Sequence, residues 1–244
     1  MPISGSSEVF SRDGAIAYLS ASQSYSVLNS TPNFTFGPAD LVSSSTTIID
    51  YHHAGSDSEA ANFTIENPSS AFTYTRRSNL LSQFVQGPGG TDGRRIFCVL
   101  GTPTRTDDIP PQSKVNFTQF AINGVIYDRR SGSTKFYTVS SGSATLSVDL
   151  TTGVVASNLS LHGVDSQGNT VDLGPYNMQA SIDINTAGFF GVPSVIETGT
   201  AAGFEGGFYG PQGAEFGYVF HEYRYAPNSG QFDLVFLGSV VGKR

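Results

Sequence analysis

The chain has 244 residues, a formal net charge of −7 and only 14% charged residues, whereas 38% are hydrophobic and 12% aromatic. A chain so rich in aromatic residues and so poor in charge can bury a core, so its composition is not that of a disordered protein. The acidic balance argues against nucleic acid as a partner, because phosphate binding requires a concentrated basic surface. No apolar stretch approaches the ~20 residues of a membrane-spanning helix.

In the N-terminal half, most segments are typical of short strands between loops. The exceptions are residues 14–21 (GAIAYLSA) and 78–86 (SNLLSQFVQ), which are predicted to be short helices. The prolines and paired aspartates of residues 101–114 interrupt any strand ladder, so we place a domain boundary there. The prediction is a smaller β-rich domain over residues 1–112 and a second domain over residues 113–244.

The second domain shows a clear alternation of apolar and polar residues. It is strongest in residues 143–150 (SATLSVDL), 176–185 (YNMQASIDIN) and 230–241 (GQFDLVFLGSVV). This period of two predicts half-buried antiparallel strands, and the turn residues between them favour a meander of hairpins. We count roughly eight strands, the number at which side chains just fill a barrel. The predicted fold class is therefore all-β, with a C-terminal eight-stranded antiparallel meander barrel.

Cys98 and three arginine pairs carry weaker signals. Cys98 is the single cysteine, and its neighbours (IFCVL) predict a buried small hydrophobe without an internal disulfide. The arginine pairs at 76–77, 94–95 and 129–130 are predicted to lie in solvated turns, because Gly and Ser flank two of them.

The histidines supply one candidate ligand site. Tyr51, His52 and His53 crowd together in DYHHAG, and all three are potential ligands of haem iron or another metal. On a strand only Tyr51 and His53 would share a face, whereas in a loop any pair could converge. A solvent-exposed turn is the alternative. His162 is predicted to lie on the surface and His221 in an aromatic cluster.

Recognisable catalytic motifs are absent from the sequence. It contains no G-x-S-x-G and no H-E-x-x-H, and the Gly-rich QGPGGTDG lacks the Lys that a phosphate loop requires. The spacing of Ser, His and Asp shows nothing beyond chance, so we expect no enzyme and assign no catalytic residue. Two alternatives stay open: a glycan-acting hydrolase with two carboxylates, and a barrel holding a small apolar ligand.

The segment GGFYGPQGAEFGYVF (206–220) resembles the signature near the C-terminus of the barrels of transferrin-binding protein B and related bacterial surface lipoproteins. The matching residues are Gly206, Phe208, Tyr209, Gly210, Pro211, Glu215 and Gly217. Residues 141–161 and 230–244 resemble that family's barrel hairpin and closing strand. The chain departs from the pattern in Gln212-Gly213-Ala214 and in Tyr218, which stands at a family glycine. We interpret the motif as architecture, in which Phe208, Phe216 and Phe220 fill the barrel.

The resemblance implies a "handle" domain beside an eight-stranded barrel. It also implies non-enzymatic capture of an iron-bearing nutrient or its carrier protein at the bacterial outer-membrane surface. The implied partners are this ligand and a TonB-dependent receptor, and the implied membrane attachment is a lipid anchor absent from this chain. Transferrin capture implies a second lobe of similar size. The alternative is a surface or secreted haem-binding protein similar to haemophores, with haem as the cofactor at Tyr51, His52 and His53.

Overall fold

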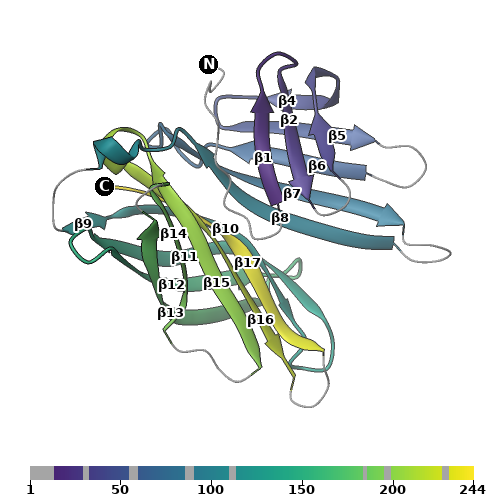
Figure 1. Cartoon of the computed structure of the whole chain (residues 1–244). Coiled ribbons are helices and arrows are strands. Elements are labelled where there is room, and N and C mark those ends of the chain that lie inside the picture. Colours follow the sequence, from purple (N-terminus) through teal and green to yellow (C-terminus); the bar gives the residue numbers. More distant parts are fainter. Residues whose placement is uncertain are drawn as a thin grey trace.

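The computed structural model describes residues 14–29, 33–54, 60–85, 91–109, 114–183, 186–194, 199–226 and 231–244. In these ranges the chain forms strands, joined by turns and three single-turn 3₁₀ helices. Figure 1 shows two bodies of strands side by side, one from each half of the chain. None of the described helices is long and apolar enough to cross a membrane.

The N-terminal body, which we call the handle, contains two antiparallel sheets. The three-stranded sheet has the order β1 (Gly14–Leu19), β2 (Ser24–Asn29), β3 (Phe34–Phe36). After the 3₁₀ helix η1 (Pro38–Asp40), the five-stranded sheet follows in chain order: β4 (Leu41–Ser44), β5 (Ile48–Ala54), β6 (Ala60–Glu66), β7 (Thr75–Val85) and β8 (Thr91–Gly101). Buried residues of both sheets, among them Val27, Phe36, Phe63 and Leu80, form one core. The handle is therefore a two-layer sandwich.

Both predicted helices were wrong. Residues 14–19 form β1, paired with β2 from Gly14–Asn29 to Leu19–Ser24, and residues 75–85 form β7, paired with β6 and β8. In β7 the buried residues Ser78, Leu80 and Ser82 recur with a period of two, not 3.6. Segments this short have little helix stability of their own, so pairing with neighbouring strands decides their conformation.

The C-terminal body is a closed barrel, as the sequence predicted. Its strands are β9 (Lys114–Phe117), β10 (Gln119–Asp128), β11 (Lys135–Asp149), β12 (Val154–Val164), β13 (Thr170–Asp183), β14 (Gly188–Pro193), β15 (Thr200–Tyr209), β16 (Glu215–Tyr225) and β17 (Phe232–Lys243). Sequential strands from β10 to β17 pair antiparallel, and β10 also pairs with β17, which closes eight strands. β9 adds a short pairing with the far end of β11.

Side chains fill the barrel interior, as the aromatic content of its strands predicted. The buried cluster includes Phe117, Ile126, Leu146, Leu159, Met178, Phe189, Phe204, Phe208, Phe216, Tyr218, Phe220 and Phe236. Tyr218, at the position of a family glycine, is fully buried, and its hydroxyl lies 3.1 Å from that of Ser157. Burial raises the pKa of Tyr218, so this phenol stays neutral inside the barrel.

The handle packs against the barrel through β7 and β8, which contact β16 and β17. Figure 1 shows these two strands as the part of the handle nearest the barrel. A separate buried cluster fills the junction, with Phe72, Phe97 and Val99 from the handle meeting Tyr209 and Val241 from the barrel. The predicted boundary between residues 112 and 113 lies outside the described residues.

The arginine pairs are not all in turns, contrary to the prediction. Residues 76–77 lie in β7 and residues 94–95 in β8, whereas residues 129–130 follow β10. Arg77 forms a bidentate ion pair with Glu66 on the neighbouring strand, at 2.7 and 2.8 Å. Arg95 reaches across to the barrel, where its guanidinium lies 5.5 Å from the centre of the Phe136 ring.

Candidate functional site

The predicted ligand residues lie on β5, and the strand divides them between its two faces. Tyr51 points toward the three-stranded sheet, with its ring 5.8 Å from Tyr25 and 6.1 Å from Phe36. His53 lies on the same side, 6.3 Å from Phe36, and its Nδ1 is 3.0 Å from the Asp40 carboxylate. The strand therefore brings Tyr51 and His53 to one face, the pairing that strand geometry had suggested.

His52 points away from this pair, to the open face of the five-stranded sheet. Its Nδ1 lies 2.9 Å from Oδ1 of Asn62, its direct partner on β6. A ligand that uses all three residues would have to contact both faces of one strand. The structure thus separates the Tyr51–His53 side from the His52 side as two distinct surfaces.

Two further tyrosines, Tyr18 and Tyr25, lie beside Tyr51 on the Tyr51–His53 face. Tyr18 lies 4.9 Å from Tyr25, and Tyr25 lies 5.8 Å from Tyr51. Burial, and secondly the neighbouring phenols Tyr51 and Tyr18, raise the pKa of Tyr25 to about 12; burial also raises the pKa of Tyr51. The phenols of Tyr25 and Tyr51 are therefore neutral near pH 7, and coordination of iron would have to displace their protons. Among the described residues, no three His, Cys, Asp or Glu side chains are grouped so that they could hold a metal.

The motif residue Glu215 lies at the junction between barrel and handle. Its side chain is completely buried and accepts four hydrogen bonds from the segment that leads into β7. The Thr73 amide donates to Oε1 at 2.7 Å, and the Tyr74 and Thr75 amides donate to Oε2 at 3.0 and 2.8 Å. The Thr75 hydroxyl adds a fourth bond at 2.7 Å. One barrel carboxylate therefore fixes the start of a handle strand.

Glycines of the same motif allow the two bodies to approach closely. A Cβ on Gly217 would lie 2.3 Å from Cγ1 of Val99, and a Cβ on Gly210 would lie 2.3 Å from the Tyr74 ring. Gly210 also has φ +73°, a conformation that side chains rarely adopt. Tyr209 is fully buried between the bodies, while its neighbour Phe208 points into the barrel core. The motif thus joins the handle to the barrel.

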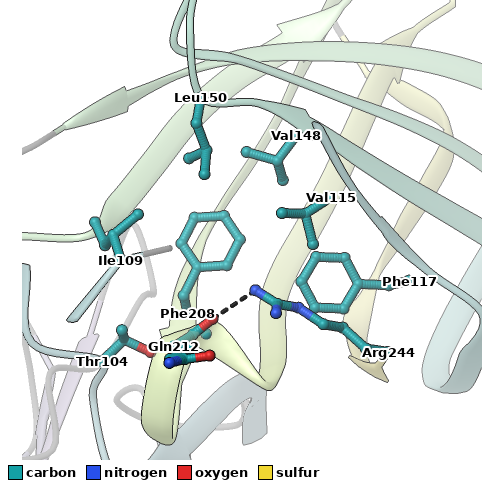
Figure 2. A pocket seen from close by; sticks show the side chains of 10 residues that line it. Thr104, Ile109, Val115, Phe117, Val148, Leu150, Phe208, Gln212 and Arg244 are labelled. Atoms are coloured by element: carbon teal, nitrogen blue, oxygen red, sulfur yellow. Dashed lines mark hydrogen bonds between the residues drawn. The ribbon is translucent and has the colours of Figure 1, made fainter. Parts of the chain in front are cut away.

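An apolar hollow lies at the end of the barrel beside this junction (Figure 2). Phe117 and Phe208 line it together with Ile109 from the connecting segment, and its volume is about 270 Å³ including the open mouth. The Arg244 guanidinium donates to the Gln212 carbonyl and lies 5.9 Å from the centre of the Phe117 ring. The hollow is therefore a shallow apolar depression with the Arg244 cation at its edge.

Three apolar side chains are exposed on the handle hairpin formed by β4 and β5, at the sheet edge farthest from β8. Leu41 is 44%, Val42 69% and Ile48 39% exposed. Val42 sits at a bulge between the pairs Leu41–Tyr51 and Ser43–Asp50, which turns it out of the ladder. A concentration of apolar side chains at a surface edge is typical of a protein-binding site. Leu41 pairs with Tyr51, whereas Ile48 lies on the His52 face of β5, so we call only the neighbouring Leu41 and Val42 the hairpin patch.

Sequence reasoning did not find the partners of Glu215 or the hairpin patch. The motif marked Glu215, but its donors lie 140 to 142 residues earlier in the chain and carry no motif of their own. The exposure of Leu41 and Val42 depends on β4 being the edge strand, which the order of strands in the sheet determines.

Comparisons place this architecture among known proteins. No protein-family model and no curated protein matches the sequence. Two solved structures of transferrin-binding protein B match the fold. One, a double mutant of the vaccine antigen from Haemophilus parasuis Hp5, has a TM-score of 0.50, 16% identity, and coverage of 95% of this chain and 50% of that chain. The other, isotype 1 from serogroup B Neisseria meningitidis, has a TM-score of 0.52, 16% identity, and coverage of 98% and 43%.

The shared feature is the fold: a closed eight-stranded barrel with additional β-sheets. The chain is a two-part protein, a handle joined to a barrel, and its fold is similar to that of transferrin-binding protein B. It spans half or less of the length of these two structures. The sequence resemblance carried by residues 206–220 is therefore matched by similarity of fold over nearly the whole chain.

Proposed function

We propose that this chain is a non-enzymatic capture protein of the bacterial outer surface. It binds an iron-bearing nutrient or its carrier protein and passes the cargo to a TonB-dependent receptor, and a lipid anchor outside this sequence holds it at the membrane. The main support is the handle-and-barrel fold, because the two solved proteins that share it are named for binding transferrin.

The hairpin patch is the surface that we assign to the captured protein. It lies at the sheet edge opposite the strand that packs on the barrel, so a large partner can reach it. Its two apolar side chains supply a desolvated centre of the kind that stable protein interfaces require. The Glu215 junction holds the handle in a fixed orientation and so lowers the entropy lost when a partner binds.

The test is a binding series with the purified chain immobilised on a biosensor. Iron-loaded transferrin, iron-free transferrin and haemoglobin are the probes, with serum albumin as the control protein. We expect saturable binding of one iron carrier and none of albumin. Equal, non-saturating responses to all four proteins would contradict capture of an iron carrier.

Haem binding is the second candidate function, and the observation that favours it is the shared face of Tyr51 and His53. Tyr18 and Tyr25 extend that face with two further aromatic rings. Phenol and imidazole are both axial ligands of haem iron in proteins. Titration with haemin, followed by the absorption spectrum, distinguishes this candidate: a saturable shift near one equivalent supports it, and a linear response removes it.

A further inference from the structure

A polar hollow lies on the outer wall of the barrel, across β11, β12 and β13. The handle packs on a different part of the barrel, at β16 and β17. The hollow has a volume of about 730 Å³ including open space, and its lining includes Ser141, Ser143, Ser160, His162, Asp172 and Gly174. It therefore presents hydroxyl groups, one imidazole and one carboxylate to solvent in a single depression.

Strand register continues this polar surface beyond the hollow, in rows that cross the three strands. Ser143 on β11 is the direct partner of Ser160 on β12. In the next row Thr145 on β11 pairs with Asn158 on β12, and Asn158 pairs with Asn177 on β13. Side chains two residues apart on a strand point to the same face, so the second row adjoins the first on the outer wall. Neither row contains a charged residue.

Hydrogen bonds between side chains orient the polar groups at both ends of this surface. Nδ2 of Asn158 donates to Oδ1 of Asn177 at 2.7 Å, which leaves the Asn177 nitrogen as a donor and the Asn158 oxygen as an acceptor for a ligand. At the other end, Nδ1 of His162 lies 2.6 Å from Oδ1 of Asp172. Groups that are held in place before a ligand arrives lose less entropy when it binds.

The serine hydroxyls between these two ends are not used to hold the fold together. In the part of the chain that the structure describes, no group is hydrogen-bonded to the hydroxyls of Ser143 and Ser160, which both line the hollow. Serines of the turns differ in this respect: the Ser22 hydroxyl donates to the Leu19 carbonyl, and the Ser45 hydroxyl accepts from the Ile48 amide. The hydroxyls of the hollow are therefore available to a ligand.

The lining of the hollow restricts the chemistry of that ligand. Its described residues include no Lys or Arg that could hold a phosphate or sulfate group. Within the described ranges, no three His, Cys, Asp or Glu side chains are grouped so that they could hold a metal ion. The two leucines of the lining, Leu161 and Leu173, belong to the barrel core, so an apolar ligand finds little surface. A neutral ligand rich in hydroxyl groups fits best, because serine hydroxyls and asparagine amides both donate and accept hydrogen bonds.

From this geometry we propose that the polar hollow and the adjoining Asn158–Asn177 row bind a short neutral oligosaccharide. Sugar hydroxyls exchange hydrogen bonds with the Ser143 and Ser160 hydroxyls and with the oriented amides of Asn158 and Asn177. The second carboxylate oxygen of Asp172 accepts a further hydrogen bond from the sugar. Because the site is open to solvent, we expect a weak affinity, with a Kd on the order of 1 mM.

The oligosaccharide is bound and not cleaved. Hydrolysis of a glycosidic bond requires two carboxyl groups, one on each side of the bond, and Asp172 is the single carboxylate among the described residues that line the hollow. Binding of a sugar at β11–β13 therefore agrees with a non-enzymatic protein. It goes beyond the proposed capture of an iron carrier and does not depend on it.

The experiment is an NMR titration of the nitrogen-15-labelled intact chain with maltotriose, mannotriose and triacetylchitotriose in turn. Glycerol, at an equal concentration of hydroxyl groups, is the control ligand. We expect at least one trisaccharide to produce saturable shifts of the amide signals of residues 141–145, 158–162 and 172–177. Glycerol should produce only small shifts that rise linearly with its concentration.

Paired alanine variants then test the assigned side chains. Asn158→Ala with Asn177→Ala is expected to raise the Kd at least tenfold, and Ser143→Ala with Ser160→Ala at least threefold. Gln119→Ala with Ser181→Ala is the matched control, because these residues are an exposed amide and an exposed hydroxyl on strands of the same barrel, outside the two rows. The control pair should leave the Kd unchanged within twofold. The amide spectrum of each variant shows whether it is folded.

Two outcomes would overturn the proposal. One is the absence of saturable shifts with all three trisaccharides at concentrations well above the expected Kd. The other is saturable binding whose shifts lie on other strands, or whose Kd is the same in both hollow variants as in the unaltered chain. Binding of carrier proteins is measured separately on the biosensor and with different probes, so the failure of one proposal leaves the other untouched.

Discussion

Glu215 of the barrel and Thr75 of the handle are joined by two hydrogen bonds, one from the Thr75 amide at 2.8 Å and one from its hydroxyl at 2.7 Å. Both residues are completely buried. Since a buried carboxylate is costly unless donors surround it, the handle and the barrel depend on each other at this point. The handle is thus fixed to the barrel by polar contacts as well as by apolar packing.

The first prediction concerns this junction. Glu215→Ala removes the acceptor of four hydrogen bonds and leaves three amides and a hydroxyl without their partner, of which the Thr75 amide and hydroxyl are buried. We expect the free energy of unfolding to fall by at least about 3 kcal/mol. Glu215→Gln keeps one oxygen acceptor and is expected to lose less. Urea unfolding followed by tyrosine fluorescence measures both.

The control for that prediction is Asp107→Asn. Asp107 is an exposed carboxylate paired with Arg105 at 2.9 Å, and exposed ion pairs contribute little. Its substitution is expected to leave the urea midpoint unchanged. Equal losses in the Glu215 and Asp107 variants would show that the buried junction has no special role.

The second prediction tests close packing at the same interface. Gly217→Ala places a methyl group 2.3 Å from Val99 Cγ1 and is expected to destabilise the protein by about 1–3 kcal/mol. Val99→Ala makes room for that methyl group, so the double variant should be more stable than additivity of the two single variants predicts. Gly37→Ala is the control, because its Cβ would meet nothing nearer than 4.0 Å. Strict additivity would exclude the direct contact.

The barrel could be predicted from the sequence because its signal is local. The alternation of Ala144, Leu146 and Val148 with polar neighbours is the burial pattern that the structure shows in β11. The burial of Cys98 was also predicted correctly from its immediate neighbours. The helix predictions for β1 and β7 failed because these segments are decided by pairing partners elsewhere in the chain, which local composition does not reveal.

Contacts across the fold could not be predicted in the same way. The motif drew attention to Glu215, yet its donors lie more than a hundred residues away. The contact between His162 Nδ1 and Asp172 Oδ1 likewise depends on the register of β12 and β13, and a shift of one residue would point His162 into the barrel. The division of Tyr51, His52 and His53 between the two faces of β5, in contrast, could be predicted from strand periodicity alone.

The third prediction separates the two faces of β5 in haem binding. If haemin binds here, Tyr51→Phe combined with His53→Ala should abolish the saturable spectral shift. His52→Ala should retain it, because His52 lies on the opposite face beside Asn62. Loss of the shift in His52→Ala alone, or unchanged binding in the triple alanine variant of Tyr51, His52 and His53, would remove the Tyr51–His53 face as the haem site.

The fourth prediction concerns stability in alkaline solution. Burial raises the pKa of the Cys98 thiol from its ordinary value of 9.0 to about 12. The thiol of the unfolded chain loses its proton first, at a lower pH than the buried thiol. The contribution of Cys98 to the free energy of unfolding is therefore fully present below pH 9 and decreases as the pH rises toward 12, by up to about 1.4 kcal/mol per pH unit. Cys98→Ala should flatten the decline between pH 9 and pH 10.5 in urea unfolding. An identical slope in both proteins would contradict thiol burial as a cause.

The fifth prediction concerns the hairpin patch, and rests on the proposed capture of a protein. Leu41→Asp with Val42→Asp replaces both apolar side chains of the patch by charges, and we expect the Kd for the captured carrier to rise at least tenfold, or about 1.4 kcal/mol. Phe190→Ser with Val192→Ser is the matched control, because these residues are 59% and 40% exposed on the barrel strand β14. Both pairs are exposed, so neither should change the thermal midpoint by more than the effect of ordinary surface substitutions. If the barrel pair weakens binding and the hairpin pair does not, the carrier docks on the barrel wall.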